Sequence, residues 1–123
     1  MNLINTDIVI QKKNMENIKL VVKIPISKLQ HNQGLMYIKK LDGYDGMLFD
    51  FGESQYVNMW MKNTFIPLDI LFFDSNRKLI NIIENTIPHD KTPLGSSMLT
   101  RYVLEVASGM VKKFGIPIGD YLK

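Results

Sequence analysis

Short apolar runs separated by turn residues follow one another along the chain, and this pattern predicts a mainly β protein. In residues 17–24, NIKLVVKI, apolar side chains at every second position form one face, which is typical of a strand buried on one side. We expect strands over residues 3–10, 17–24, 46–51, 55–62, 68–74, 77–84, 101–107 and 119–123. Tight turns such as the one at residues 74–76 favour a mostly antiparallel meander.

Two short helices and one long loop are expected between these strands. Ser27 is a suitable N-cap for a helix that ends near Gly34, and Ser108 is a suitable N-cap for a second helix that ends at Gly115. Residues 85–100 contain two prolines and several hydroxyl side chains, so we expect an irregular loop of a length that often carries function. The predicted fold is a single domain over residues 1–123, a β-sandwich or barrel-like structure with two short helices.

Composition changes this picture mainly by exclusion. A chain of 123 residues can fold as one domain without disulfides or a structural metal. The net charge of +3 comes mostly from scattered lysines without interleaved aromatic residues, so we expect no nucleic-acid partner. The chain has no cysteine and only two isolated histidines, and it lacks a glycine-rich nucleotide loop; we therefore expect no metal and no cofactor.

Targeting signals and membrane spans in the sequence bear on the compartment of the protein. No run approaches the ~18 apolar residues of a membrane span, so we expect a soluble protein. The N-terminal residues lack the basic, apolar and small-residue order of a signal peptide, which favours the cytoplasm. The oligomeric state is left open by the sequence.

The central segment 59–70, MWMKNTFIPLDI, sets polar side chains among apolar ones. Alternation over residues 55–62 predicts one apolar face and one face that carries two aromatics, an amide and an ammonium: Tyr56, Asn58, Trp60 and Lys62. Such a face suits a small polar ligand with a flat apolar side, such as a sugar, stacked on Trp60. Asn63 in the next turn and Ser97 in the long loop complete the candidate ligand-binding set. The alternative is that Trp60 packs beneath a loop while Lys62 reaches solvent.

Two carboxylates stand in otherwise apolar strands, Asp69 and Glu105. A buried charge is costly unless it is paired, so each needs a partner, and Lys62 is one candidate. Together the three residues form a candidate catalytic set, in which two carboxyl groups with separated pKa values serve as acid and base. The alternative is a hydrogen-bonded network that only supports the fold.

Several motifs resemble the bacterial and archaeal family called domain of unknown function 192. They are GLM at 34–36, GMLFDF at 46–51, MWMKNTFIPLDILFFD at 59–74, RYVLEV at 101–106 and GIPIGD at 115–120. The resemblance implies a compact, mainly β, sandwich or barrel-like fold with short helices, and no established activity. It also implies that many relatives are exported, which the N-terminus of this chain does not suggest.

Three functions follow from these features. The favoured one is a non-catalytic binding module for a small, saccharide-like ligand on the Trp60 face, covered by residues 85–100. The second is a small hydrolase or lyase that uses Asp69 and Glu105 as acid and base. The third is a structural or protein-interaction domain.

Overall fold

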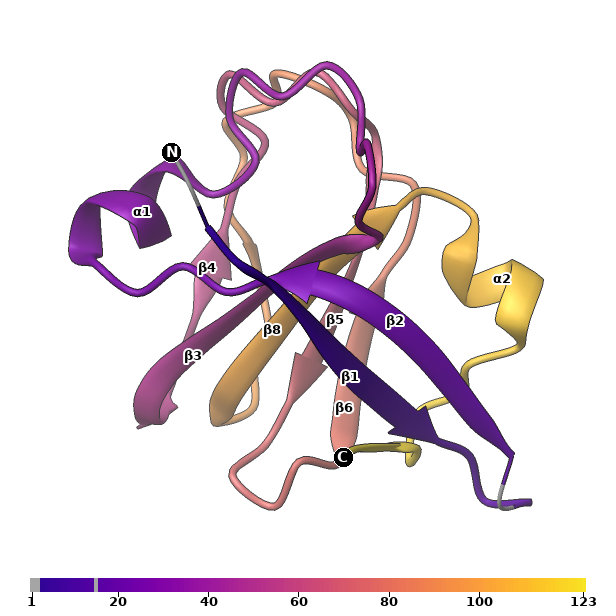
Figure 1. The fold of residues 1–123 in the computed structure, drawn as a ribbon. Coiled ribbons are helices and arrows are strands. Elements are labelled where there is room, and N and C mark those ends of the chain that lie inside the picture. Colours follow the sequence, from indigo (N-terminus) through magenta and orange to yellow (C-terminus); the bar gives the residue numbers. More distant parts are fainter. Residues whose placement is uncertain (1–2, 15) are drawn as a thin grey trace.

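The computed structural model describes residues 3–14 and 16–123, which form a mainly β structure (Figure 1). Nine strands and two short helices lie within these residues. In chain order they are β1 (Asn5–Gln11), β2 (Asn17–Lys23), α1 (Lys28–Gln33), β3 (Gly46–Gln55), β4 (Asn58–Met59), β5 (Leu68–Phe73), β6 (Leu79–Ile83), β7 (Leu94–Gly95), β8 (Thr100–Ala107), α2 (Met110–Phe114) and β9 (Tyr121–Leu122). The predicted fold class, mainly β with two short helices, is confirmed.

One large sheet organises the molecule, with the strand order β6-β5-β8-β3-β2-β1-β9. Its neighbouring strands are antiparallel except for β2 and β3, which are parallel and are joined through α1. At one edge β9 pairs with β1, and Tyr121 also forms a bridge to Lys78, just before β6 at the other edge. The sheet therefore curls until its two edges approach each other, as a half-barrel (Figure 1).

Two apolar cores lie on the two faces of this sheet. Strand β8 divides between them, because Leu104 and Val106 point into the curled sheet while Val103 points outward. The inner core joins side chains from both sheet edges, such as Ile10 of β1 and Leu79 of β6. The outer core is covered by apolar side chains from two connecting segments, residues 35–44 and 57–66. These segments form a second layer, and the candidate site lies under it.

The strand expected over residues 55–62 is wrong in extent. Strand β3 continues to Gln55, and only Asn58–Met59 forms β4, paired with the two-residue β7. The loop expected over residues 85–100 is therefore not wholly irregular. The predicted alternation survives, since Val57 is buried whereas Tyr56 is 70% exposed. Close approach of β4 and β7 requires Gly95, because a Cβ there would overlap the Asn58 side chain.

The helix ends confirm three of the four predicted signals. The Ser27 hydroxyl accepts a hydrogen bond from the Gln30 amide at 3.1 Å, and the Gln30 side chain completes a capping box. Gly34 ends α1, and Gly115 ends α2 in the left-handed conformation. Ser108 is the wrong N-cap: its hydroxyl hydrogen-bonds the Asn85 side chain instead.

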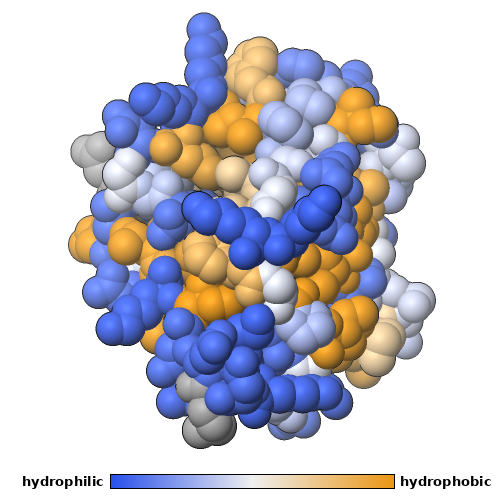
Figure 2. All heavy atoms as spheres, turned by 90° about the vertical axis from the view of Figure 1, so that its right-hand side faces the viewer, coloured by the Kyte–Doolittle hydropathy of each residue, from blue (hydrophilic) through white to orange (hydrophobic). Residues whose placement is uncertain are grey.

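The side of the molecule that carries α2 is seen in Figure 2, where hydrophilic side chains break up the hydrophobic patches. The Lys12 ammonium donates hydrogen bonds to the carbonyls of Phe114 and Gly115, at 3.0 and 2.7 Å, where α2 ends. A cation at this position satisfies the last carbonyls of the helix. Among the described residues, neither helix has the length and apolar character that crossing a membrane requires.

Candidate functional site

A cavity of about 280 Å³ opens on the outer face of the sheet. Residues 31–36, from the end of α1 and the turn after it, form one wall, and residues 58–60 form another. Phe49 and Phe51 of β3, Thr64 and Glu105 of β8 complete its lining. Trp60 is 44% exposed at this site, so its ring is accessible to a ligand.

Aromatic rings make up much of the lining. The His31 ring meets Phe49 and Phe51 edge-on, with centroids 5.7 and 5.6 Å apart. The two phenylalanine rings are nearly parallel at 6.4 Å. Edge-to-face contacts of this kind fix ring orientation beyond simple burial, so α1 is held against β3 through His31.

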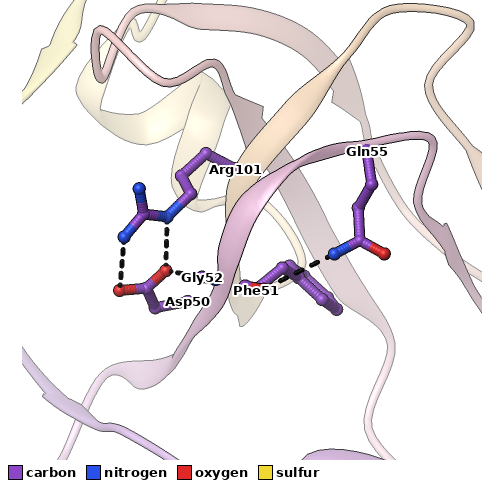
Figure 3. Close-up of polar contacts among 5 residues, drawn as sticks. All are labelled: Asp50, Phe51, Gly52, Gln55 and Arg101. Carbon is purple, nitrogen blue, oxygen red and sulfur yellow. Dashed lines mark hydrogen bonds and ion pairs between the residues drawn. The ribbon is translucent and has the colours of Figure 1, made fainter.

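The position of Phe51 is fixed by a polar cluster at the end of β3 (Figure 3). Arg101 binds both oxygens of Asp50, at 2.7 and 3.3 Å, and this hydrogen-bonded guanidinium lowers the pKa of Asp50. The Asp50 carboxylate also accepts the Gly52 amide at 2.8 Å, and the Gln55 side chain donates to the Phe51 carbonyl. The ladder between β3 and β8 is irregular after Asp50, so these bonds replace regular pairing there.

Glu105 is the most unusual residue of the cavity. Its side chain is almost fully buried, with 4% of the residue exposed, yet within the described part of the chain its carboxyl group has no hydrogen bond or ion pair. Burial raises the pKa of Glu105 to about 8, because desolvation disfavours the charged form. At neutral pH this carboxyl group is therefore mostly protonated.

Asp69 has the opposite environment. It is fully buried, and its carboxylate accepts hydrogen bonds from the amides of Asn85 at 3.0 Å, Gly109 at 3.1 Å and Val111 at 3.0 Å. The last two amides belong to the start of α2, whose N-cap residue provides no side-chain cap. Asp69 thus caps a helix from a distant strand, which is the structural alternative considered for it.

The predicted acid and base pair does not form. In the register of β5 and β8, Asp69 lies opposite Val106, and Glu105 lies opposite Ile70. Directly opposed residues point to the same face and successive residues to opposite faces, so the two carboxyl groups lie on different sides of the sheet. They cannot flank one cleft, and two-carboxylate chemistry is excluded by this geometry.

Two of the predicted ligand-binding residues, Asn58 and Trp60, line the cavity. Lys62 does not; its ammonium lies over the Trp60 ring, 5.1 Å from the centroid. Trp60 is partly exposed, which differs from the alternative in which it packs beneath a loop.

The other three predicted residues lie outside the lining. Tyr56 and Ser97 are exposed, and the Asn63 side chain donates to the Tyr37 hydroxyl at 2.9 Å. Residues 85–100 are all described, and none of them lines the cavity. The wall opposite Trp60 comes from residues 31–36 instead, so the prediction that the long loop covers this face is wrong.

His31, Phe49 and Phe51 are among the lining residues that sequence reasoning missed, as is Thr64. The phenylalanines alternate as core residues of a strand do, and His31 is one of two isolated histidines in the sequence. Only the parallel crossover from β2 through α1 to β3 brings the helix next to these rings. No local sequence signal could have indicated that contact.

A second cavity of about 280 Å³ adjoins the first across Gln33 and Gly34. Lys23, Lys40 and Tyr44 line it, and the Lys23 ammonium lies 4.8 Å from the centre of the Tyr44 ring. Lys23 and Lys40 therefore line the second cavity and not the one that contains Glu105. Within residues 3–14 and 16–123, no three histidines or carboxylates gather closely enough to hold a metal ion.

Comparisons with known proteins extend the motif resemblance. The model of the family described as Uncharacterized ACR, domain of unknown function 192, matches residues 9–123. No curated protein matches the chain. A solved structure from Sinorhizobium meliloti 1021, described as a candidate transcription regulator, is 37% identical with a TM-score of 0.95, and the match covers 100% of this chain and 95% of that one. Another solved structure, a protein of unknown function from Novosphingobium aromaticivorans DSM 12444, is 29% identical with a TM-score of 0.89. That match covers 97% of this chain and 84% of the other.

Proposed function

Because the chain belongs to the Uncharacterized ACR family, domain of unknown function 192, whose description assigns no activity, we propose a function from its own cavity. The protein is a non-catalytic binding module for a small polar molecule with a flat apolar side, such as a saccharide. One observation carries the proposal: a partly exposed Trp60 ring and a buried, unpartnered Glu105 line the same cavity in the described structure.

Size and lining support a small ligand. Ligand sites commonly span ~300–1,000 Å³, and this cavity, at about 280 Å³, is slightly smaller than the lower limit of that range. A single sugar ring fits this scale better than an oligosaccharide. Trp60 offers an apolar face for stacking, and the Asn58 amide and Thr64 hydroxyl lie in the same lining to orient hydroxyl groups.

The description of the Sinorhizobium meliloti relative as a candidate transcription regulator concerns that protein, and for this chain we propose no role in reading DNA. A helix that reads the major groove must present several base-contacting side chains, whereas α1 and α2 comprise six and five residues. The lysines are also scattered along the sequence rather than clustered with arginine.

Trp60 is the only tryptophan, so its fluorescence reports directly on the cavity. The experiment titrates purified protein with monosaccharides, amino sugars, nucleosides and cell-envelope fragments, and follows both emission and thermal unfolding. A compound present at 100 times its Kd should stabilise the fold by ~2.7 kcal/mol.

The variants locate the site. Trp60→Ala should abolish the thermal shift, whereas Tyr56→Ala, which truncates an exposed aromatic residue outside the lining, should keep it. The proposal fails if no compound shifts the melting temperature, or if the shift persists unchanged in Trp60→Ala.

The second candidate is a hydrolase or lyase in which Glu105 alone supplies the proton. It is favoured by one observation, the burial of the Glu105 carboxyl group in the cavity lining. This burial raises the pKa of Glu105 to about 8, so that the acid is protonated at neutral pH, as a general acid must be. Turnover of aryl glycosides that is lost in Glu105→Gln but kept in Tyr56→Ala would support this function. An absence of turnover in the wild-type protein would remove it.

A further inference from the structure

The carboxyl group of Glu105 is buried without a hydrogen-bond or ion-pair partner among the described residues. Buried polar groups in folded proteins almost always have a partner, and this one has none in the described structure. The fold even leaves the space beside it open. Gly34 lies over the carboxyl group, and a Cβ there would come within 3.9 Å of Glu105 Oε1 and 3.2 Å of Phe49 Cζ. The φ of Gly34 is +50°, which also disfavours a side chain at this position.

The charges around the cavity favour one sign of ligand. His31 is the other titratable residue of the lining, and Met47 and Ile70, which flank Glu105 on the same face, are apolar. No lysine or arginine belongs to the described lining: the Lys62 ammonium lies over the Trp60 ring, and Lys23 and Lys40 line the second cavity. An ionised Glu105 would thus meet no fixed cation of the protein here.

The aromatic rings of the cavity, like the Glu105 carboxylate, favour a positively charged ligand. The face of an aromatic ring is electrically negative, so Phe49, Phe51 and Trp60 attract a cation and repel an anion. Trp60 already demonstrates this, since its ring holds the Lys62 ammonium at 5.1 Å. A cavity lined by three such rings and one carboxyl group has the composition of sites that bind organic ammonium groups.

We infer that the ligand of this cavity carries a positively charged nitrogen, which pairs with the Glu105 carboxylate among the rings of Phe49, Phe51 and Trp60. This inference rests on the proposed function and names the chemical class of its ligand: an organic cation, such as an amino sugar or a quaternary ammonium compound. Binding would leave Glu105 ionised, and the ligand would supply the partner that the fold omits.

Matched pairs of probes test the charge alone. Choline is compared with 3,3-dimethylbutan-1-ol, which has the same shape without the charge, and glucosamine is compared with N-acetylglucosamine. Trp60 fluorescence and calorimetry give the Kd values. We expect the charged member of at least one pair to bind at least tenfold more tightly. Glu105→Gln should abolish that preference, whereas Glu84→Gln, the same change at an exposed position, should keep it.

The pH dependence supplies an independent readout with a permanently charged probe. Because the pKa of Glu105 is about 8, choline should bind about tenfold more tightly at pH 9 than at pH 7, as the carboxylate forms. A neutral ligand that accepts a hydrogen bond from the protonated acid would show the opposite trend.

Each outcome decides between the two claims. Equal binding of the two members of both pairs, or choline affinity that falls as the pH rises, overturns the inference. If neutral sugars bind through Trp60 while neither cation is preferred, the proposed function stands and the inference fails. If no compound binds, both fail. If Glu105→Gln does not fold, Trp60→Leu tests the ring contribution, and unchanged choline affinity in that variant also overturns the inference.

Discussion

Replacing Glu105 with Gln should change how the stability of this protein depends on pH, even without a ligand. The substitution keeps the shape of the side chain and removes its ionisation. In the folded protein, burial raises the pKa of Glu105 from 4.5 to about 8. Between these two values the folded state retains a proton that the unfolded chain has released.

The sign of the effect follows from this difference. A state that binds more protons is favoured at low pH, so the contribution of Glu105 to stability is fully present below pH 4.5. It is lost progressively as the pH rises and is gone once the pH passes about 8. One pKa unit corresponds to ~1.4 kcal/mol, so the rise from 4.5 to about 8 corresponds to a loss of up to about 5 kcal/mol. Domains of this size are stable by only ~5–15 kcal/mol, so the loss should be readily measurable.

The assay is urea-induced unfolding, followed by circular dichroism at intervals between about pH 5 and pH 9. The wild-type protein should lose stability across this range relative to Glu105→Gln, so that the variant is the more stable protein at the alkaline end. Glu84→Gln changes an exposed carboxylate and should run parallel to the wild type. A constant difference between wild type and Glu105→Gln at every pH would refute the reasoning, because it would mean that Glu105 is not desolvated in the folded state.

Three further substitutions separate structural roles by thermal or urea unfolding. Asp69→Ala removes a buried acceptor from three backbone amides. It should lower the free energy of unfolding by at least ~4 kcal/mol, because each hydrogen bond to a charged group contributes ~1.5–3 kcal/mol. A decrease below ~1 kcal/mol would contradict the role of Asp69 as a helix cap. Gly46→Ala would place a Cβ against the backbone carbonyl of Glu105 on the neighbouring strand, and it should lower the free energy of unfolding by more than ~3 kcal/mol. A variant as stable as the wild type would show that β3 and β8 do not approach each other closely at Gly46. Arg101→Gln breaks a partly exposed ion pair with Asp50 and should cost less than ~1 kcal/mol at moderate salt, so a larger loss would indicate a stronger role for that pair.

The sequence by itself determined most of the secondary structure. Alternation of apolar residues located the strands, because one face of a strand must be buried and side chains alternate strictly between the faces. Capping chemistry is equally local, and it located α1 between Ser27 and Gly34. The alternation around Trp60 also correctly separated buried from exposed side chains, although the strand there proved to be only two residues long.

The site was predicted only in part. Asn58, Trp60 and Glu105 were recognised because polar and aromatic residues in apolar segments need an explanation, and all three line the cavity. The sequence could not decide what would satisfy the two carboxylates. Asp69 and Glu105 have similar sequence surroundings. The Asp69 carboxylate accepts hydrogen bonds from three backbone amides, two of them at the start of α2, whereas the Glu105 carboxyl group faces a cavity with no described partner.

Strand register in the tertiary structure determines which of the two carboxyl groups finds a partner. A shift of one residue in the pairing of β5 and β8 would set Asp69 directly opposite Glu105, so that both carboxyl groups lay on one face of the sheet. Register depends on contacts far apart in the chain. The same is true of the cavity wall, where His31 meets Phe49 and Phe51 because a parallel crossover places α1 over β3. Local patterns fix which residues are strands and which faces are apolar, whereas long-range pairing fixes which buried groups find partners and which remain open to a ligand.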